Sequence, residues 1–331
     1  MGLPQISHPK KKNLRIGLTK IELAMIKNIK KVFAIITLFS VCGAFAQQDP
    51  QYTQYMYNTL TVNSAYAGSL GHLAITGIYR TQWVGIKGAP DTQSFSLDTP
   101  VGKNVGLGIS IVNEEIGPTD EQYLDANFSY TIKSGETHKL SFGLKGGGRV
   151  INIDWSKGSY KDPDVQFREN ITNKFLPVVG AGLYWHGERD YIGVSIPNFM
   201  TRERYTYDDI SEDLVNQRIH LYLIGGIVFD LSAHTKFKPA VFVKYVAGAP
   251  IIADFSANFM FNNVLTLGAS YRTSDSVSGL VGIQITPMIM AGYAYDYTTT
   301  ALQNYNSGTH EIMLRFELVS RKKGLKSPRF F

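Results

Sequence analysis

The sequence predicts an all-β fold: a transmembrane up-and-down antiparallel β-barrel of about 14 strands, of the outer-membrane type. Three observations support it: residue alternation with a period of two, connections of unequal length, and a composition rich in aromatic residues and glycine. The 331 residues include 19 Tyr, 18 Phe, 3 Trp and 31 Gly, and aromatic side chains favour strands over helices. No run approaches about 18 consecutive apolar residues, which excludes a bundle of transmembrane helices.

Alternation predicts the strands one by one between positions 73 and 318. In the run 104–114, Leu107, Ile109 and Ile111 alternate with Gly106 and Gly108. Each run has one apolar, aromatic-rich face and one face of polar residues or glycine, as a half-buried strand requires. The expected strands are 73–82, 91–99, 104–114, 122–133, 138–153, 176–186, 190–197, 217–230, 236–246, 251–262, 264–273, 278–286, 288–298 and 309–318.

The connections predict which way the barrel stands in a membrane. Those after the even-numbered strands are short, such as 134–137 and 187–189, whereas 154–175 and 198–216 are long and polar. Short turns at one end and long loops at the other are typical of outer-membrane barrels. A soluble sandwich or lipocalin-like barrel would show the same alternation with its faces inverted. However, side chains fill a barrel interior comfortably only up to about eight strands.

Several basic residues on the polar faces are candidates for the barrel lumen. A charge turned onto the lipid face near the bilayer centre costs about 2–4 kcal/mol, so these residues are tolerated at membrane depth only if they face inward. For the same reason the sheet must close, because an unpaired backbone amide in hydrocarbon costs several kcal/mol. The candidates are Lys139, Lys145, Arg149, Lys244 and Arg315.

The segments outside the barrel are assigned from charge and hydropathy. Residues 25–46 have the basic start, short apolar core and Ala44-Phe45-Ala46 ending of a cleaved signal peptide, and 1–24 are expected to be extra sequence ahead of the true start at Met25. Residues 47–72 form an expected periplasmic N-terminal segment and 319–331 a basic periplasmic tail. These assignments predict export to the outer membrane, where the barrel contacts lipid.

The formal net charge of +6 does not indicate a nucleic-acid partner. Residues 1–46 contain eight basic side chains and one acidic one, which leaves 25 basic and 26 acidic residues from position 47 onward. The positive charge therefore belongs to the presequence and not to a binding face.

Four sequence boxes resemble one family. They are DPQYTQYMYN at 49–58, VNSAYAG at 62–68, YRTQWVGI at 79–86, and GLGIS with NEEIGP at 106–118. Together they resemble the PorP/SprF family of outer-membrane proteins of Bacteroidetes, which is associated with type IX secretion and gliding. The resemblance covers nearly the whole mature chain, although Ser64 stands where the family often has proline.

The resemblance implies a non-enzymatic barrel that works with the type IX machinery. Its expected partners are other type IX secretion components and a large secreted surface adhesin with a type IX C-terminal sorting domain. The resemblance brings no catalytic residues and no cofactor. The alternative function is a passive pore or small-solute transporter, with a lumen of mixed charge.

The partner-interface candidates lie mostly in the first two boxes. Four tyrosines within fifteen residues could anchor a partner, because aromatic side chains dominate many interfaces. They could equally pack into the mouth of the barrel itself, and the sequence does not decide between the two. The candidates are Tyr52, Tyr55, Tyr57, Tyr66, Arg80 and Trp83.

The remaining motifs carry little functional weight. Gly146-Gly147-Gly148 lies within a strand with no helix after it, so a close backbone approach explains it better than a phosphate loop. Loop carboxylates could bind calcium, which prefers several oxygen ligands, but solvated loop charges explain them more simply. These carboxylates are Asp162, Asp164, Asp208 and Asp209. The sequence has neither a G-x-S-x-G nor an H-E-x-x-H motif.

Overall fold

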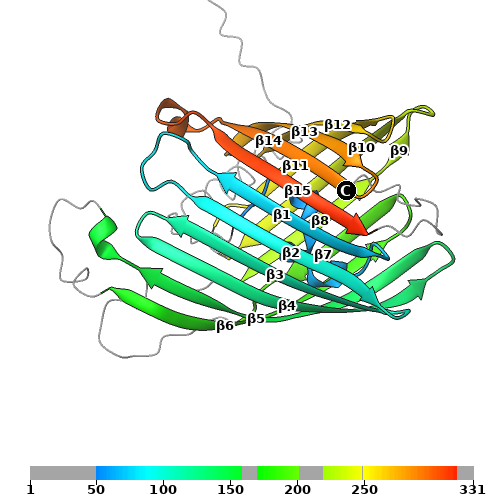
Figure 1. Ribbon diagram of the computed structural model, residues 1–331, viewed down its shortest axis with the longest axis horizontal. Helices are drawn as coiled ribbons and strands as arrows, with labels where there is room; N and C mark the ends of the chain where they lie inside the picture. The colour runs from blue at the N-terminus through cyan, green and yellow to red at the C-terminus, as the bar shows by residue number, and fades with distance from the viewer. Residues whose placement is uncertain (1–49, 159–169, 201–218, 248, 319–331) are drawn as a thin grey trace, which may run out of the picture. The chain divides into compact units, whose positions relative to one another are not determined.

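A computed structural model describes residues 50–158, 170–200, 219–247 and 249–318. The described part is a single sheet of antiparallel strands that closes on itself (Figure 1). Within it, no helix is both long and apolar enough to cross a membrane. The expected presequence, the basic tail and the four loop aspartates lie outside the described residues.

Consecutive strands pair with each other, as in an up-and-down barrel, except that β8 and the two-residue β9 both pair with β10. The first strand, β1, also pairs with the last, β15, along their whole length, from Leu73 opposite Leu318 to Thr81 opposite His310. The strands are β1 Leu73–Thr81, β2 Asp91–Val101, β3 Val105–Ile116, β4 Thr119–Ser134, β5 His138–Ile153, β6 Ile171–His186, β7 Asp190–Ile196, β8 His220–Ile227, β9 Phe229–Asp230, β10 Thr235–Val246, β11 Ile252–Phe261, β12 Leu265–Arg272, β13 Ser276–Thr286, β14 Ile289–Thr298 and β15 Thr309–Leu318.

The barrel has fourteen staves although the sheet has fifteen labelled strands. β8 and β9 pair with successive parts of β10 and are separated only by Val228, whose side chain is buried. They are one stave with an interruption, where the alternation predicts a single strand over 217–230. The predicted closed barrel of about 14 strands is therefore confirmed.

The two ends of the barrel differ as the connections predict. At one end, called here the short-turn end, the strands are joined by 102–104, 135–137, 187–189, 231–234, 262–264 and 287–288. At the other, the loop end, lie the connections 82–90, 117–118, 154–170, 197–219, 247–251, 273–275 and 299–308. β1 starts and β15 finishes at the short-turn end.

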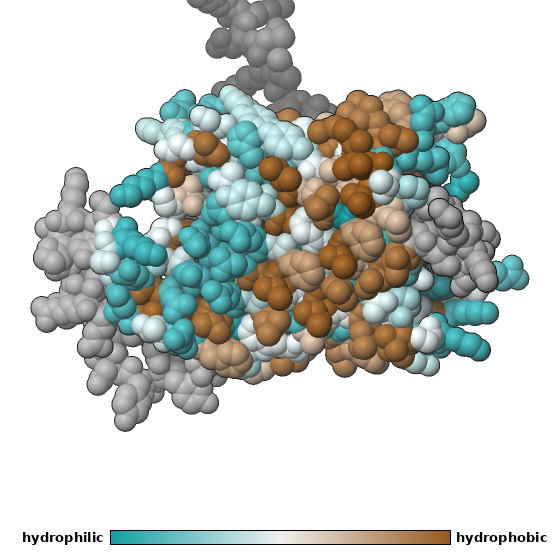
Figure 2. All heavy atoms as spheres, in the orientation of Figure 1, coloured by the Kyte–Doolittle hydropathy of each residue, from teal (hydrophilic) through white to brown (hydrophobic). Residues whose placement is uncertain are grey.

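The wall of the barrel is apolar outside and polar inside. In β5, Phe142 and Leu144 are exposed while Ser141 and Lys145 are buried, and the same inversion recurs around the sheet. Figure 2 shows hydrophobic side chains gathered across the middle of the visible wall, with hydrophilic residues toward both ends. This pattern is expected of a barrel whose outer face contacts lipid. A soluble barrel would instead turn its apolar face inward.

Aromatic side chains mark both ends of the apolar band. Phe229, Phe237 and Phe259 stack in a row near the short-turn end, with ring centroids 6.3 and 4.8 Å apart. Exposed tyrosines on the outer face lie toward the loop end, including Tyr245 and Tyr297. Such girdles sit at the two membrane–water interfaces of outer-membrane barrels.

Candidate functional site: the plugged lumen

The lumen contains the segment that precedes the first strand. Residues 50–72, called the plug below, form three short helical turns inside the barrel, and from Tyr52 to Ala67 every residue except Thr61 is buried. The turns are η1 Tyr55–Tyr57, α2 Thr59–Val62 and η2 Ser64–Tyr66. This corrects the expectation that 47–72 is a periplasmic segment, because its described part, residues 50–72, is enclosed by the barrel. The sequence leaves packing into the mouth of the barrel open as one of two interpretations, but the segment has neither strand nor helix periodicity from which its course could be predicted.

At the loop end, the wall binds the plug through the plug's backbone. The carboxylate of Glu311 accepts hydrogen bonds from the backbone N–H groups of Thr53, at 2.9 Å, and Gln54, at 2.8 Å. The carboxylate of Asp296 accepts from the Thr53 hydroxyl at 2.7 and 2.8 Å. Hydrogen bonds to charged groups are stronger than neutral ones, so these two carboxylates hold the start of the plug firmly.

The same two carboxylates are paired with Arg80 of β1. The guanidinium lies 2.9 Å from Glu311 and 2.8 Å from Asp296, and its Nη1 also donates to the Thr53 hydroxyl at 2.9 Å. Arg80 is 3 % exposed and Glu311 0 %. Each charge is thus removed from water and compensated by its neighbours, as buried charges must be.

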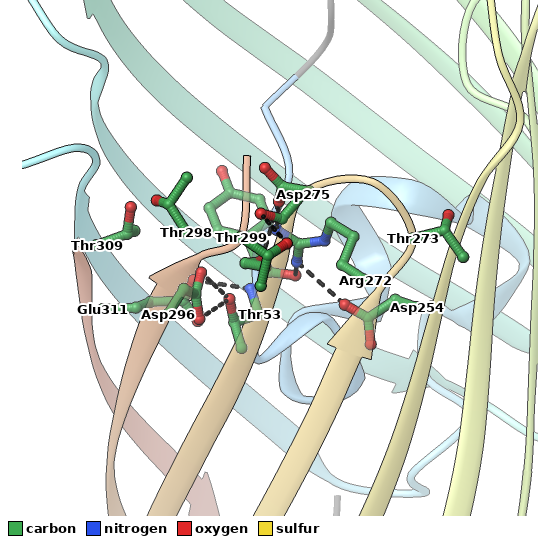
Figure 3. A network of polar contacts seen from close by, with 12 residues as sticks. Thr53, Asp254, Arg272, Thr273, Asp275, Asp296, Thr298, Thr299, Thr309 and Glu311 are labelled. Carbon is green, nitrogen blue, oxygen red and sulfur yellow. Dashed lines mark hydrogen bonds and ion pairs between the residues drawn. The ribbon is translucent and has the colours of Figure 1, made fainter. Parts of the chain in front are cut away.

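A second arginine extends this network along the wall (Figure 3). Arg272 of β12 lies 3.2 Å from Asp254 and 3.1 Å from Asp275, and it donates to the backbone carbonyl of Tyr52 at 3.5 Å. The four carboxylates Asp254, Asp275, Asp296 and Glu311 therefore share two arginines. We call these six charged residues, with Thr53, the latch.

Further along the plug, basic and hydroxyl side chains of the wall donate to backbone carbonyls. Arg315 donates to Tyr57 at 2.6 Å and Lys145 to Thr61 at 3.0 Å. Toward the short-turn end, Asp98 accepts from the N–H of Gly68 at 2.9 Å. Two hydroxyls complete the set: Ser195 to Val62 at 2.6 Å and Ser129 to Ala67 at 2.7 Å.

Inward-facing glycines let the plug approach the wall closely. A Cβ on Gly143 would collide with the backbone of Ala65, and one on Gly106 would collide with the carbonyl of Ala67. On Gly193 it would lie 2.8 Å from the side chain of the plug's Asn63. Glycine in a strand often marks such a close approach. These three glycines form the seat of the plug, that is, the part of the wall's inner surface against which its backbone packs.

The four candidate tyrosines pack against the barrel's own wall. Tyr55 contacts Phe242 with ring centroids 5.1 Å apart, and Tyr66 meets Tyr184 edge-on at 5.6 Å. Tyr52, Tyr55, Tyr57 and Tyr66 are all buried. Of the two interpretations that the sequence leaves open, the structure shows self-packing for these side chains.

Among the predicted lumen charges, Lys145, Arg149, Lys244 and Arg315 are buried inside the barrel. Lys145 pairs with Asp125 at 3.0 Å and Arg149 pairs with Glu121. Lys139 shares their alternation but is exposed, because it lies next to the turn 135–137, where the barrel interior meets water. The acidic latch residues Asp296 and Asp275 were not singled out by the sequence, although strand alternation already places Glu311 and Asp254 on polar faces.

Trp83 lies outside the lumen, in the loop 82–90. Its backbone has φ 46°, a left-handed conformation that is uncommon for a bulky residue. The backbone N–H of Trp83 donates to the hydroxyl of Thr309 at 3.1 Å. The backbone N–H of Val84 donates to the carbonyl of Gly308 at 2.9 Å, and the carbonyl of Val84 accepts from the N–H of Ser307 at 2.7 Å. The loops 82–90 and 299–308 are therefore joined into one platform at the loop end, with Trp83 half-buried in it.

Packing explains two glycines of the triplet in β5. A Cβ on Gly147 would collide with Asp125, one on Gly148 would collide with the ring of Phe175, and Gly146 faces open space. Among the described residues, no group of three or more His, Cys, Asp or Glu side chains is placed to hold a metal ion.

The fold and the filled lumen define the class: an outer-membrane β-barrel whose interior is occupied by its own N-terminal segment. Within this class the family is given by a sequence match. The family model described as type IX secretion system membrane protein PorP/SprF matches residues 44–316. The chain belongs to this family, which supports a role in type IX secretion at the outer membrane.

Two solved structures illustrate a distant resemblance. No functionally curated protein matches the sequence. Among solved structures, the outer-membrane protein Omp33 of Acinetobacter baumannii is 10 % identical with a TM-score of 0.44, covering 74 % of this chain and 97 % of its own. The CymD monoaromatic hydrocarbon channel is 11 % identical with a TM-score of 0.46, covering 83 % and 94 %. Similarity this low carries no argument, so the fold rests on the strand pairing above.

Proposed function

We propose that this chain is a non-enzymatic interaction protein, which serves the secretion and cell-surface attachment of a cognate large adhesin through the type IX route. The adhesin carries a type IX C-terminal sorting domain, and the chain works beside other components of the secretion machinery. An adhesin of this kind would support adhesion or gliding motility. The chain reaches the outer membrane after cleavage of its signal peptide behind Ala46.

The observation that supports an interaction role over a passive pore is the plug. A diffusion pore needs a continuous water-filled path, as in porins. Here backbone groups from Thr53 to Gly68 are bonded to the wall at successive levels of the lumen. Releasing the plug would break the hydrogen bonds that the buried carboxylates of Glu311 and Asp296 accept from Thr53 and Gln54, and hydrogen bonds to charged groups are the stronger kind.

The plug also narrows the choice of partner surface. The buried tyrosines are not available to another protein while the plug is seated. The platform formed by the loops 82–90 and 299–308 is exposed at the loop end, where Val84, Leu302 and Tyr305 present apolar surface. Trp83 lies in this platform and remains the best partner-interface candidate of the original six.

The test is a deletion of the gene, followed by mass spectrometry of proteins released from the cell surface by protease. We expect one very large surface protein to be lost and to be restored by the wild-type gene. A pull-down of the tagged chain in mild detergent should recover the same protein, and Trp83→Ala should reduce its recovery. Normal display of every large surface protein in the deletion strain would refute the proposed function.

A further inference from the structure

Three lysines lie close together at the short-turn end of the barrel. Lys133 of β4 and Lys139 of β5 stand directly opposite each other across the two strands, and both are exposed. Lys103, also exposed, lies in the turn 102–104, whose backbone is hydrogen-bonded to Thr131 of β4 at 2.7 Å. We call these three residues the lysine rim.

Further into the barrel, the same two strands compensate each inward-facing charge. Arg149 of β5 pairs with Glu121 of β4, and Lys145 of β5 pairs with Asp125 of β4. Two lysines directly opposite each other instead bring like charges together, with Cβ atoms about 5 Å apart, which destabilises a sheet. The stability of the barrel therefore does not explain the lysine pair of the rim.

The lysine rim has no acidic partner within the part of the chain that the structure describes. Glu136 lies in the turn between the two strands and Glu188 in the next turn, but neither forms an ion pair with the rim. Two inward-facing carboxylates at this end are already engaged, since Asp98 accepts a backbone hydrogen bond from the plug and Glu317 pairs with an arginine of its own strand. The rim thus presents uncompensated positive charge.

The lysine pair of the rim faces the mouth of the barrel and not the lipid. Along β4, Lys133 shares the inward side with Ser129, whereas Ile132 is on the outer side. A lysine that reached lipid headgroups would extend from the outer face, along its apolar surface. The short turns of outer-membrane barrels face the periplasm. The charge is therefore offered to a molecule in the periplasm, near the point where Ser129 binds Ala67 of the plug.

We propose that the lysine rim is a docking site for a carboxylate-rich segment of a periplasmic protein. The proposal rests on the proposed function, because it names the chemistry by which the barrel contacts another component of the secretion machinery. Carboxylates seated among the three lysines form charge-assisted hydrogen bonds, which are the stronger kind, and remove the repulsion between Lys133 and Lys139. Salt screens exposed charges, so the contact weakens as the ionic strength rises.

Carbodiimide crosslinking tests the contact directly, because it joins a lysine amine to a carboxylate only where the two groups meet. Cells that carry the tagged full-length chain are permeabilised and treated with carbodiimide, and the joined peptides are identified by mass spectrometry. We expect Lys133 or Lys139 to be joined to an Asp or Glu side chain of one periplasmic protein. Recovery of a protein without this linkage does not count in favour of the site.

Three double variants show whether charge at the rim holds that protein. Charge is reversed in Lys133→Glu with Lys139→Glu and kept in Lys133→Arg with Lys139→Arg. The matched control is Lys87→Glu with Lys157→Glu, which makes the same change of net charge at exposed positions of the loop end. Correct folding of each variant is checked by heat-modifiable gel mobility.

The charge-reversed variant is expected to recover about tenfold less of the partner without crosslinker, because each contact then brings like charges together. The arginine variant should recover the partner normally but lose the linkage at both positions, since a guanidinium does not couple to a carboxylate in this reaction. The loop-end control should behave as the wild type.

Three results would overturn the docking site. They are linkage of the rim only to Glu136 or Glu188 of the same chain or to cell-wall material, the absence of any linkage, and undiminished recovery by the charge-reversed variant. None of them touches the adhesin role, which fails only if the deletion strain displays every large surface protein normally. The two proposals can therefore fail separately.

Discussion

Gly143 of β5 lies directly against the backbone of Ala65 in the plug, so closely that a Cβ on the glycine would overlap the backbone nitrogen of Ala65. The contact joins a position on the wall to one in the segment that precedes the first strand. At this position the plug packs directly against the backbone of the wall, so a single side chain added to the wall would displace it.

Gly143→Val should therefore unseat the plug. The added side chain has no space between the wall and η2, and overpacking of this kind typically costs about 1–3 kcal/mol. We expect a lower midpoint of urea unfolding and faster proteolysis of the plug in purified protein. The matched control is Gly146→Val on the same strand, which faces outward with nothing within 4 Å of its Cβ. Equal effects of the two substitutions would contradict the conclusion that the plug packs against Gly143.

The sequence predicts the barrel well and the plug poorly, for one physical reason. Every stave separates lipid from lumen, so its residues must alternate, and that alternation can be counted. The plug meets the wall on all sides and has no lipid-facing residues, so no period marks its course. Its position depends on long-range contacts such as Thr53 with Glu311, 258 residues apart.

The same reasoning explains the smaller differences. Alternation gives the orientation of Lys139 correctly but carries no information about how near a residue lies to the end of the barrel. The predicted run 217–230 misses the interruption at Val228 because a buried residue there keeps the hydrophobic pattern intact. The tyrosines left both interpretations open, since an interface and a plug need the same side chains.

Glu311→Gln should destabilise the latch strongly. The amide keeps the size of the carboxylate but removes a negative charge paired with Arg80. Its NH2 group would also point at N–H donors of Thr53, Gln54 or Arg80, where the carboxylate accepts hydrogen bonds. Breaking a buried ion pair on one side costs about 3–5 kcal/mol, so we expect a loss of that order in the free energy of unfolding. Urea titration of purified protein in detergent measures it.

An exposed ion pair at the short-turn end provides the comparison for the latch. Arg189 and Asp230 lie 2.6 Å apart, with exposed fractions of 61 and 42 %. Asp230→Asn should change the free energy of unfolding by less than about 1 kcal/mol, because water screens exposed pairs. If Glu311→Gln were equally mild, the latch would not be holding the plug.

Leu144→Lys should impair insertion of the barrel into the membrane. Leu144 is 59 % exposed on the outer face of β5, between two buried positions that face the lumen. A lysine on the lipid face near the bilayer midplane costs about 2–4 kcal/mol. We expect less folded protein in the outer-membrane fraction. Glu136→Lys, in the turn that joins β4 to β5, should leave that amount unchanged. A normal yield for Leu144→Lys would contradict the position of the apolar band.

Conductance in planar bilayers should separate the plugged barrel from a pore. Full-length protein is expected to show no steady conductance, because the plug occupies the lumen from Thr53 to Gly68. A variant lacking residues 50–68 should conduct steadily if it folds, as checked by heat-modifiable mobility, and Gly143→Val should open intermittently. Gly146→Val should stay silent like the wild type, since its side chain points to lipid. Steady conductance of the full-length protein, equal to that of the deletion, would show that the plug does not close the barrel. It would then favour the transporter over the interaction protein.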